Sequence, residues 1–379
     1  MSRTTALPTL LGLTLAVSGC ITGSNLPPPI RVAAGTDAEY VAAGIERPGG
    51  VAVAADGRVF FTEKNTGRIR VISSGELLPD PFAEVPVNAA GERGVLGIAL
   101  HPDFVRNGRV YVFYTRSDTG ETTTDPQAVI DNRVVYFVAD GDRASGGELF
   151  VASLPAGSTT SRISGRIAFD ADGRLCVALG DLGEEAAPQE DDALGGKVLR
   201  FNDDGTIPAS NPTAGSAVFA RGFRDFTGLA LESQTGVLFA SDDNASGNDE
   251  INRIAPAGNY GWPAVVGTAD TDAEFEFVDN TPNYVDPILA TGRENPGIVG
   301  LAFNPGAKYG PAQRGDLFYA ESGRGRVQCL TLNADRIGVA SRKLFAENFP
   351  APIRDIAFSP SGTLYVATDR AILRCVPFP

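Results

Sequence analysis

The stretch from Asn248 to Pro263 contains the densest group of residues that could do chemistry in this chain. Asp249 and Glu250 are adjacent carboxylates, and carboxylate oxygens are ligands that Ca²⁺ prefers. Tyr260 and Trp262, which is the only tryptophan of the chain, follow in a segment with two glycines. Glycine permits backbone turns that other residues avoid. The stretch therefore indicates either a cation site or a polar turn closed by aromatic side chains.

Composition limits the classes to which the protein can belong. Its 379 residues suffice for several small domains or for one large all-β domain. The 44 glycines and 26 prolines favour many short strands joined by turns. The net charge of -14 argues against nucleic acid as a partner, because a phosphate-binding surface must be basic.

The first 20 residues have the pattern of a bacterial lipoprotein signal peptide. Arg3 provides a positive start, residues 6–17 are mainly apolar, and small residues precede Cys20. Cys20 would be the lipidated first residue of the mature chain, and residues 21–36 would be a tether. We therefore expect an extracytoplasmic protein at the outer membrane or facing the periplasm, touching the membrane only through this lipid. The alternative is an ordinary signal peptide that contains a cysteine.

Three further cysteines, Cys176, Cys329 and Cys375, lie in strand-like apolar runs. Because three thiols cannot all pair within one chain, we expect them to be mainly buried and structural. A disulfide between Cys329 and Cys375 remains open. Their spacing shows no zinc pattern.

A weak internal repeat organises the rest of the chain. Each copy has an alternating apolar run, a turn and a second apolar run. The copies begin at Gly50-Val-Ala-Val, Gly97-Ile-Ala-Leu, Gly165-Arg-Ile-Ala, Gly228-Leu-Ala-Leu, Gly300-Leu-Ala-Phe and Arg354-Asp-Ile-Ala. Alternation with period two predicts strands.

Six copies predict an all-β fold over residues 37–379, a six-bladed β-propeller with four-stranded antiparallel blades. The last copy ends before a fourth strand, so residues 38–45 are expected to supply that strand and close the ring. Loops at one end of the central channel are then expected to carry the site. A pair of β-sandwiches or another number of blades is the alternative.

Several motifs accompany the repeat in a fixed order. They include Gly91-Glu-Arg-Gly, Ser164-Gly-Arg-Ile, Leu179-Gly-Asp-Leu-Gly183, Gly222-Phe-Arg-Asp-Phe-Thr-Gly228, Asn259-Tyr-Gly-Trp-Pro263 and Gln313-Arg-Gly-Asp-Leu-Phe318. In this order they resemble the glucose/sorbosone dehydrogenase family, over roughly residues 45–376. The resemblance implies a quinoprotein propeller that oxidises aldoses with pyrroloquinoline quinone (PQQ) and Ca²⁺.

PQQ is a planar tricarboxylate, so its pocket needs cationic donors, of which arginine is the most suitable. The resemblance implies that Arg224 and Arg354 contact PQQ, unless they only bridge blades through main-chain carbonyls. Glu92 and Asp225 occupy two further contact positions, where the family has Gln and Asn. The charge of Glu92 would repel the cofactor. The first arginine of a C-terminal pair falls on Pro352.

The catalytic base of the family is a histidine whose position falls on Arg162. A guanidinium stays protonated and cannot accept a proton. Asp181 matches the carboxylate that orients this histidine, and beside Arg162 we expect its pKa to be lowered. Asp181 as an ordinary turn residue is the alternative. His101, the one histidine of the chain, falls in a structural turn of the family.

For metal binding, the resemblance implies a structural Ca²⁺ held by Glu250, Tyr260 and Asp270. The turn that holds the cofactor's own Ca²⁺ in the family falls on residues 243–246, whose types differ. We therefore expect a lipid-anchored, PQQ-dependent aldose dehydrogenase with a small sugar as substrate. The alternative is a catalytically degenerate propeller that binds Ca²⁺ and either a saccharide or a protein.

Overall fold

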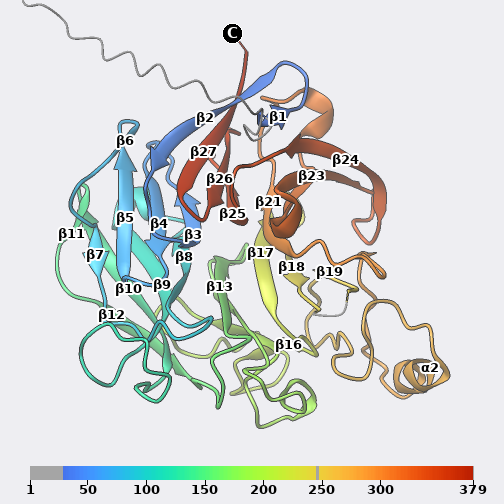
Figure 1. The fold of residues 1–379 in the computed structure, drawn as a ribbon. Helices are drawn as coiled ribbons and strands as arrows, with labels where there is room; N and C mark the ends of the chain where they lie inside the picture. The colour runs from blue at the N-terminus through green and yellow to red at the C-terminus, as the bar shows by residue number, and fades with distance from the viewer. Residues whose placement is uncertain (1–28, 245–246, 379) are drawn as a thin grey trace, which may run out of the picture.

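The computed structural model describes residues 29–244 and 247–378. Within these residues, the strands form six antiparallel sheets arranged around a central axis (Figure 1). The predicted six-bladed β-propeller is confirmed, and the alternatives of a β-sandwich pair or another number of blades are wrong. The predicted signal peptide with Cys20, and residues 21–28 of the predicted tether, lie outside the described residues.

Each sheet is built from strands that follow one another from the axis outward. The innermost strands are β3 (Pro48–Val53), β8 (Val95–Leu100), β13 (Ser164–Phe169), β17 (Phe226–Glu232), β21 (Ile298–Phe303) and β25 (Ile353–Phe358). The second strands are β4 (Val59–Glu63), β9 (Arg109–Thr115), β14 (Leu175–Leu179), β18 (Val237–Asp242), β22 (Leu317–Glu321) and β26 (Leu364–Thr368). The third strands are β5 (Arg68–Ser73), β10 (Asn132–Asp140), β15 (Lys197–Phe201), β19 (Glu250–Arg253), β23 (Arg326–Leu332) and β27 (Ala371–Pro377). The outer strands are β6 (Glu76–Leu77), β7 (Ala83–Glu84), β11 (Arg143–Ala144), β12 (Leu149–Leu154), β16 (Val218–Arg221), β20 (Leu289–Ala290), β24 (Val339–Glu347) and β2 (Thr36–Ala43).

The ring closes at both its inner and its outer edge. Each innermost strand packs beside the innermost strand of the next sheet, and β25 packs beside β3. The outer strand of the last sheet is β2, which pairs antiparallel with β27 (Figure 1). Inside the predicted tether, β1 (Arg31–Val32) pairs with β24 at the edge of the fifth sheet. The last part of that segment is therefore part of the folded domain.

The burial of each strand explains its pattern of apolar residues in the repeat. The innermost strand β13 alternates between buried and partly exposed residues, because one of its faces lines the central channel. The second strands β4, β14, β22 and β26 are buried at every position, because each is covered by a neighbouring sheet on both faces. Six apolar clusters result, one between each pair of neighbouring sheets. In one of them, Phe113 of β9 and Val177 of β14 are both fully buried.

Every innermost strand has a β-bulge near its start, where residues lack a partner on the second strand. The unpaired residues are Gly49 and Gly50, Leu96, Gly165, Thr227, Gly300 and Arg354. Two glycines show why the repeat needs them: a Cβ on Gly97 would lie 2.2 Å from the Gly165 carbonyl oxygen, and Gly300 has a φ of +57°. A bulge changes the direction of a side chain and is common beside active sites.

Helices contribute little and lie between strands: α1 (Phe104–Asn107), α2 (Asp272–Asp279), η1 (Ala187–Gln189), η2 (Pro311–Gln313) and η3 (Ser322–Arg324). Among the described residues, no helix combines the length and apolarity needed to cross a membrane. Cys176, Cys329 and Cys375 are buried free thiols. The prediction that they are structural is consistent with this burial, and Cys329 and Cys375 do not pair.

Candidate active site

The bulged starts of the innermost strands surround a cavity of about 520 Å³ on the axis, which we call the axial cavity. Every sheet contributes to its wall from the bulge region, with Gly49, Leu96, Ser164, Thr227, Val299 and Arg354. The irregularity that recurs in each blade therefore shapes one common cavity. This cavity lies at one end of the central channel, where the sequence predicted a site.

Four cations line the axial cavity: Arg166, and a group of three formed by Arg47, Lys64 and Arg354. Burial, followed by the positive charge of Arg47, lowers the pKa of Lys64 to about 8, although Glu92 opposes this shift. Burial and the charge of Arg354 lower the pKa of Arg47 as well. The three cations therefore repel one another, and an anionic ligand among them would relieve that repulsion.

Arg354 is held in place by a carboxylate at the end of the neighbouring strand. Its Nε and Nη2 lie 2.6 and 3.0 Å from the two carboxylate oxygens of Asp369. This paired geometry fixes the plane of the guanidinium. Arg354 is also the bulged residue of β25, and it lines the axial cavity. The predicted cofactor contact is thus placed where a ligand can reach it.

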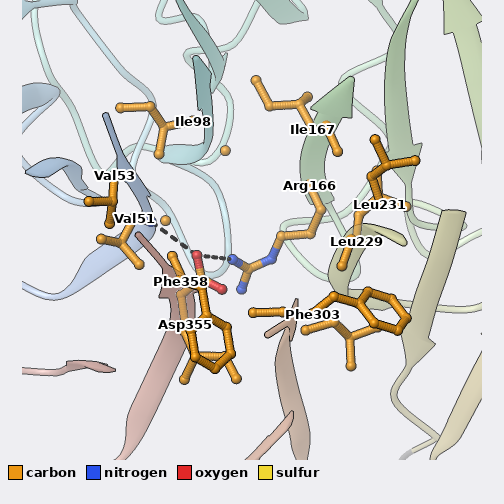
Figure 2. A pocket seen from close by; sticks show the side chains of 18 of the residues that line it. Val51, Val53, Ile98, Arg166, Ile167, Leu229, Leu231, Phe303, Asp355 and Phe358 are labelled. Carbon is orange, nitrogen blue, oxygen red and sulfur yellow. Dashed lines mark hydrogen bonds and ion pairs between the residues drawn. The ribbon is translucent and has the colours of Figure 1, made fainter. Parts of the chain in front are cut away.

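Arg166 forms the floor of the axial cavity and also lines a second cavity, whose side chains Figure 2 shows. Its Nη1 donates to the Gly49 carbonyl oxygen at 2.9 Å, and its Nη2 donates to the Arg354 carbonyl oxygen at 3.2 Å. Its Nη1 also lies 3.5 Å from Oδ2 of Asp355, which accepts a hydrogen bond from Val51 N at 3.0 Å. One side chain of the third sheet therefore connects the bulged starts of the first and last sheets.

Below Arg166 lies a second cavity of about 310 Å³, the lower cavity. The side chains around it are mostly aliphatic or aromatic and come from later positions of the innermost strands, including Val53, Ile98, Ile167, Leu231, Phe303 and Phe358 (Figure 2). Arg166 lines both cavities, and it is the one residue that their described walls share.

A side pocket of about 430 Å³ adjoins the axial cavity. Arg162 and Arg224 line this pocket. Three residues line both the side pocket and the axial cavity, and all three are acidic: Glu92, Asp225 and Asp243. The boundary between the two spaces is therefore a row of carboxylates.

Arg162 is fixed from both its main chain and its side chain. Its φ of +57° lies in the left-handed region, which a non-glycine residue seldom adopts and which often marks functional sites. Its N–H donates to Oε2 of Glu92, and its Nε lies 2.9 Å from Oδ1 of the fully buried Asp181. The predicted contact between Arg162 and Asp181 is confirmed, and the guanidinium leaves no proton acceptor at the Arg162 position.

The prediction of a lowered pKa for Asp181 is wrong. Burial raises its pKa above the ordinary value, and this effect exceeds the lowering by the Gly183 N–H and by the charge of Arg162. Sequence reasoning counted the nearby charge but not the loss of solvent. Because Asp181 is fully buried and hydrogen bonded, it supports Arg162 from behind and does not line either cavity.

Arg224 connects this buried support to the cavity wall. Its carbonyl oxygen accepts a hydrogen bond from Asp181 N at 2.8 Å, and its Nη1 donates to the Asp243 carbonyl oxygen at 2.8 Å. Its guanidinium carbon lies 5.5 Å from the ring centre of Trp262, whose Nε1 donates to Asp181 at 3.1 Å. Arg224 therefore lines the side pocket, and its side chain bonds a main-chain carbonyl of its own sheet, whereas the alternative expected a bond between two blades.

Asp225 lies at the start of the fourth sheet and is fixed by its neighbours. Its N–H donates to Oδ1 of buried Asp242 at 2.5 Å, and its carbonyl oxygen accepts from Asp243 N at 2.9 Å. Ser164 Oγ donates to its Oδ1 at 2.9 Å. The predicted contact position is therefore occupied by an oriented carboxylate on the cavity wall.

The residues predicted to bind Ca²⁺ lie in different surroundings. Glu250 is buried, burial raises its pKa to about 7, and its oxygens accept from Gly267 N and Asn252 Nδ2 at 2.7 and 2.9 Å. The Tyr260 hydroxyl donates to the Arg253 carbonyl oxygen at 2.6 Å, so only its main-chain oxygen remains for a metal. Asp270 is exposed. No group of three His, Cys, Asp or Glu side chains in residues 29–244 and 247–378 is arranged to hold a metal.

Sequence reasoning missed Arg47 and Lys64. It quoted Ser164, Arg166 and Asp243 within motifs or turns of the family but gave them no role in this cavity. One available signal was position, because Lys64 and Asp243 directly follow the second strands β4 and β18. A polar residue placed immediately after an apolar strand of the repeat comes to the same end of the channel in every blade. The inward position of Arg166 had no comparable signal.

Comparison with known proteins agrees with this geometry. The profile of the glucose/sorbosone dehydrogenase family matches residues 45–374, which is most of the chain. This chain belongs to the glucose/sorbosone dehydrogenase family.

Several proteins similar to this chain are named as dehydrogenases. The chain is 28% identical to aldose sugar dehydrogenase YliI of Escherichia coli (strain K12) over 349 residues, covering 86% of this chain and 88% of that protein. It is 30% identical to quinoprotein glucose dehydrogenase B of Acinetobacter calcoaceticus over 260 residues, covering 62% of this chain and 54% of that protein. The PQQ-bound form of aldose sugar dehydrogenase from Streptomyces coelicolor has a TM-score of 0.74 at 26% identity, covering 93% of this chain and 99% of that chain.

The site of this family member fits the carboxylates of PQQ. Arg47, Lys64 and Arg354 form a cationic group, and Arg166 adds a fourth cation at the floor. Asp369 pairs with Arg354, and Glu92, Asp225 and Asp243 line the same cavity and offset part of this positive charge. The difference from a typical member lies at the boundary with the side pocket, where Glu92 and Asp225 are negative and Arg162 is positive. The residues that would bind the cofactor and the residues that would transfer a proton therefore lie in different parts of the site.

Proposed function

We propose that this chain is a PQQ-dependent dehydrogenase that oxidises aldose sugars. The observation that supports the proposal most directly is the cationic group of Arg47, Lys64 and Arg354 in the axial cavity of a glucose/sorbosone dehydrogenase fold. When bound, PQQ supplies the oxidant, since its quinone accepts a hydride from the carbon that bears the sugar hydroxyl.

The residues of the chain have separate tasks in this proposal. Arg354 would bind a cofactor carboxylate in a plane that Asp369 already fixes, and Arg47 and Lys64 would add charge-assisted hydrogen bonds. Arg166 would hold the Arg354 main chain and block the axial cavity from below. The side pocket beside Arg162 would admit the sugar.

We also propose a structural Ca²⁺ near Glu250. Glu250 is a buried carboxylate, and the buried Oδ1 of the neighbouring Asn252 has no hydrogen-bond partner in the described structure. Oxygen atoms of this kind are Ca²⁺ ligands. Asp270 and the main-chain oxygen of Tyr260 would complete the set that the family resemblance implies.

The proposed cofactor can be tested through Trp262. This residue is the only tryptophan of the chain and contacts Arg224 and Asp181 beside the cavities, so its fluorescence should change when PQQ binds. We expect saturable quenching by PQQ, followed by dye-linked oxidation of one or more aldoses. Lys64→Met should weaken PQQ binding. Absence of quenching and of turnover in the wild-type protein would contradict the proposal.

A second candidate function is supported by one specific observation, the contact between Arg162 and Asp181. It places a guanidinium where relatives would need a base, so the chain would bind a saccharide or a protein without oxidation. The same experiment separates the two functions. Quenching by PQQ without turnover of any aldose would favour the binding function.

We further propose that the chain is a lipoprotein anchored at Cys20 and located outside the cytoplasm. The signal-peptide pattern of residues 1–20 supports this proposal. Expression in a Gram-negative host should place the wild-type protein in the membrane fraction, and Cys20→Ala should release it or block its processing. A wild-type protein recovered entirely from the soluble fraction would contradict the anchor.

A further inference from the structure

We propose that Asp225 accepts the proton of the sugar hydroxyl in this chain, and that Ser164 orients its carboxylate. The inference rests on the proposed dehydrogenase function and names the residue that replaces the missing histidine.

Position is the first reason. Asp225 lines both the axial cavity and the side pocket, so its carboxylate reaches the place where cofactor and sugar would meet. Arg162 lines only the side pocket, and its guanidinium has no lone pair to accept a proton. Asp181 lies behind Arg162 and lines neither space.

Availability of an oxygen atom is the second reason. Oδ1 of Asp225 accepts from Ser164 Oγ at 2.9 Å, whereas Oδ2 accepts no hydrogen bond from any described residue. Of the other two boundary carboxylates, Glu92 accepts the Arg162 N–H, and Asp243 shares a hydrogen bond with Asp249. Asp225 and Glu92 therefore each have one bonded and one available oxygen, and Asp225 differs from Glu92 in being half-buried, whereas Glu92 is exposed.

Rigidity is the third reason. Asp225 is tied through its main chain to Asp242 and Asp243, and Ser164, with a φ of +60°, holds its side chain from the next sheet. A base that is already oriented needs no rearrangement before proton transfer. The left-handed backbone conformations of Arg162 and Ser164 therefore bring the Ser164 hydroxyl to the Asp225 carboxylate.

The surrounding charges agree with the role. Burial, followed by the negative charge of Glu92, raises the pKa of Asp225 well above its ordinary value, and Asp243 and Asp242 raise it further. The Ser164 hydrogen bond opposes this shift. A carboxylate with a raised pKa is a stronger base near neutral pH than an ordinary aspartate.

The O–H bond of the anomeric hydroxyl breaks, and its proton goes to Oδ2 of Asp225. The adjacent C–H bond breaks, and its electron pair leaves with the hydrogen as hydride to the quinone oxidant of the proposed function. The aldose is left as a lactone, and the protonated Asp225 returns its proton to solvent.

The test compares three carboxylate-to-amide variants of the PQQ-loaded protein. Asp225→Asn should lower kcat by about 100-fold or more, the usual contribution of a general base. Its PQQ affinity, measured by Trp262 fluorescence, should stay the same or tighten because a negative charge is lost. Glu92→Gln should lose at least tenfold less activity than Asp225→Asn. Asp316→Asn, at a buried aspartate outside all three cavities, is the control for folding.

Ser164→Ala provides a readout that a purely structural role would not change. Without the Ser164 hydrogen bond the pKa of Asp225 should rise, so the acidic limb of the pH profile of kcat/KM should move to higher pH. An unchanged profile would overturn the orienting role of Ser164.

Three results would overturn the inference in distinguishable ways. Turnover of Asp225→Asn within about threefold of wild type would exclude Asp225 as the base and leave the proposed function standing. A gain of about tenfold in Arg162→His that survives Asp225→Asn would place the base at position 162 instead. PQQ binding without wild-type turnover, or no PQQ binding at all, would remove the reaction itself and the inference with it.

Discussion

The axial cavity and the lower cavity are walled by the same six innermost strands, yet they differ in chemistry. The axial cavity contains Arg47, Lys64 and Arg354 on one side and carboxylates at its boundary, whereas the lower cavity is lined mainly by aliphatic and aromatic side chains. The lining side chains change from charged to mainly aliphatic and aromatic at Arg166, which lies between the bulged and the regular parts of the strands (Figure 2).

This difference shows how one repeat provides both a scaffold and a site. Where the ladder is regular, alternation directs a small set of apolar side chains toward the axis. Where each strand is bulged, the alternation is interrupted, and residues such as Arg354 and Thr227 can face the cavity. Loops that follow the second strands then bring Lys64 and Asp243 to the same end.

Removing Arg166, which separates the axial cavity from the lower cavity, should have the largest effect on stability and on PQQ affinity. Arg166→Met leaves the Asp355 carboxylate buried without its cation, and breaking such a pair costs about 3 kcal/mol of unfolding free energy. PQQ affinity should fall about tenfold or more because the Arg354 carbonyl loses its donor. Chemical denaturation and Trp262 fluorescence measure the two effects.

Arg200→Met is the matched control for that experiment. Arg200 is a buried arginine paired with Asp170 at 2.6 Å, and it does not line the axial cavity. It should lower stability without changing PQQ affinity. Equal losses of PQQ affinity in both variants would show that Arg166 acts only through stability.

A substitution in the lower cavity tests whether this cavity affects stability without affecting PQQ affinity. Leu301 is buried between the fourth and fifth sheets and lines the lower cavity. Leu301→Ala should cost about 2–4 kcal/mol of unfolding free energy, because it removes packed methyl groups and leaves a void. Its PQQ affinity should remain within about twofold of wild type. A large loss of affinity would mean that the two cavities are not independent.

The pH dependence of PQQ binding should follow Lys64. Its lowered pKa of about 8 means that the folded protein binds this proton less tightly than the unfolded chain, so its burial destabilises the fold below pH 8 and less so above. The positive charge of Lys64, which would attract PQQ, is lost as pH rises through about 8. Affinity should therefore fall by about tenfold between pH 7 and 9, the size of one charge-assisted hydrogen bond.

Lys64→Met should abolish most of that pH dependence and bind PQQ as the wild type does at high pH. Titrations of Trp262 fluorescence at several pH values measure both proteins. A wild-type affinity that does not change across this range would indicate that Lys64 does not contact the ligand.

Calcium should have the smallest effect. At pH 8 the Glu250 carboxylate, with a pKa of about 7, is mainly ionised, and a bound Ca²⁺ would neutralise it. Addition of Ca²⁺ after chelation should then raise Tm by ~3–6 °C, as expected for a ligand that binds only the folded state. Glu250→Gln should remove this response. A wild-type Tm that is insensitive to Ca²⁺ would contradict the metal site.

The sequence predicted the ring because its signals are local. Alternation, a turn and a glycine recur six times, and each signal concerns residues that are neighbours in one hairpin. Arg354, Arg224, Glu92 and Asp225 were found because they lie in motifs of a known family. The Asp181 pKa was predicted in the wrong direction, because burial depends on the packing of loops that local patterns do not describe.

The tertiary structure alone decided which side chains meet at the axis. Arg166 and Arg354 are 188 positions apart in the chain, and the motif that contains Arg166 does not reveal that its side chain reaches the axis. The contact of Ser164 with Asp225 also joins two sheets. The repulsion of Arg354 by Lys64 and Arg47 joins the last sheet to the first. Such contacts arise only when the six blades close into a ring, because closure sets the distances between residues that no local pattern relates.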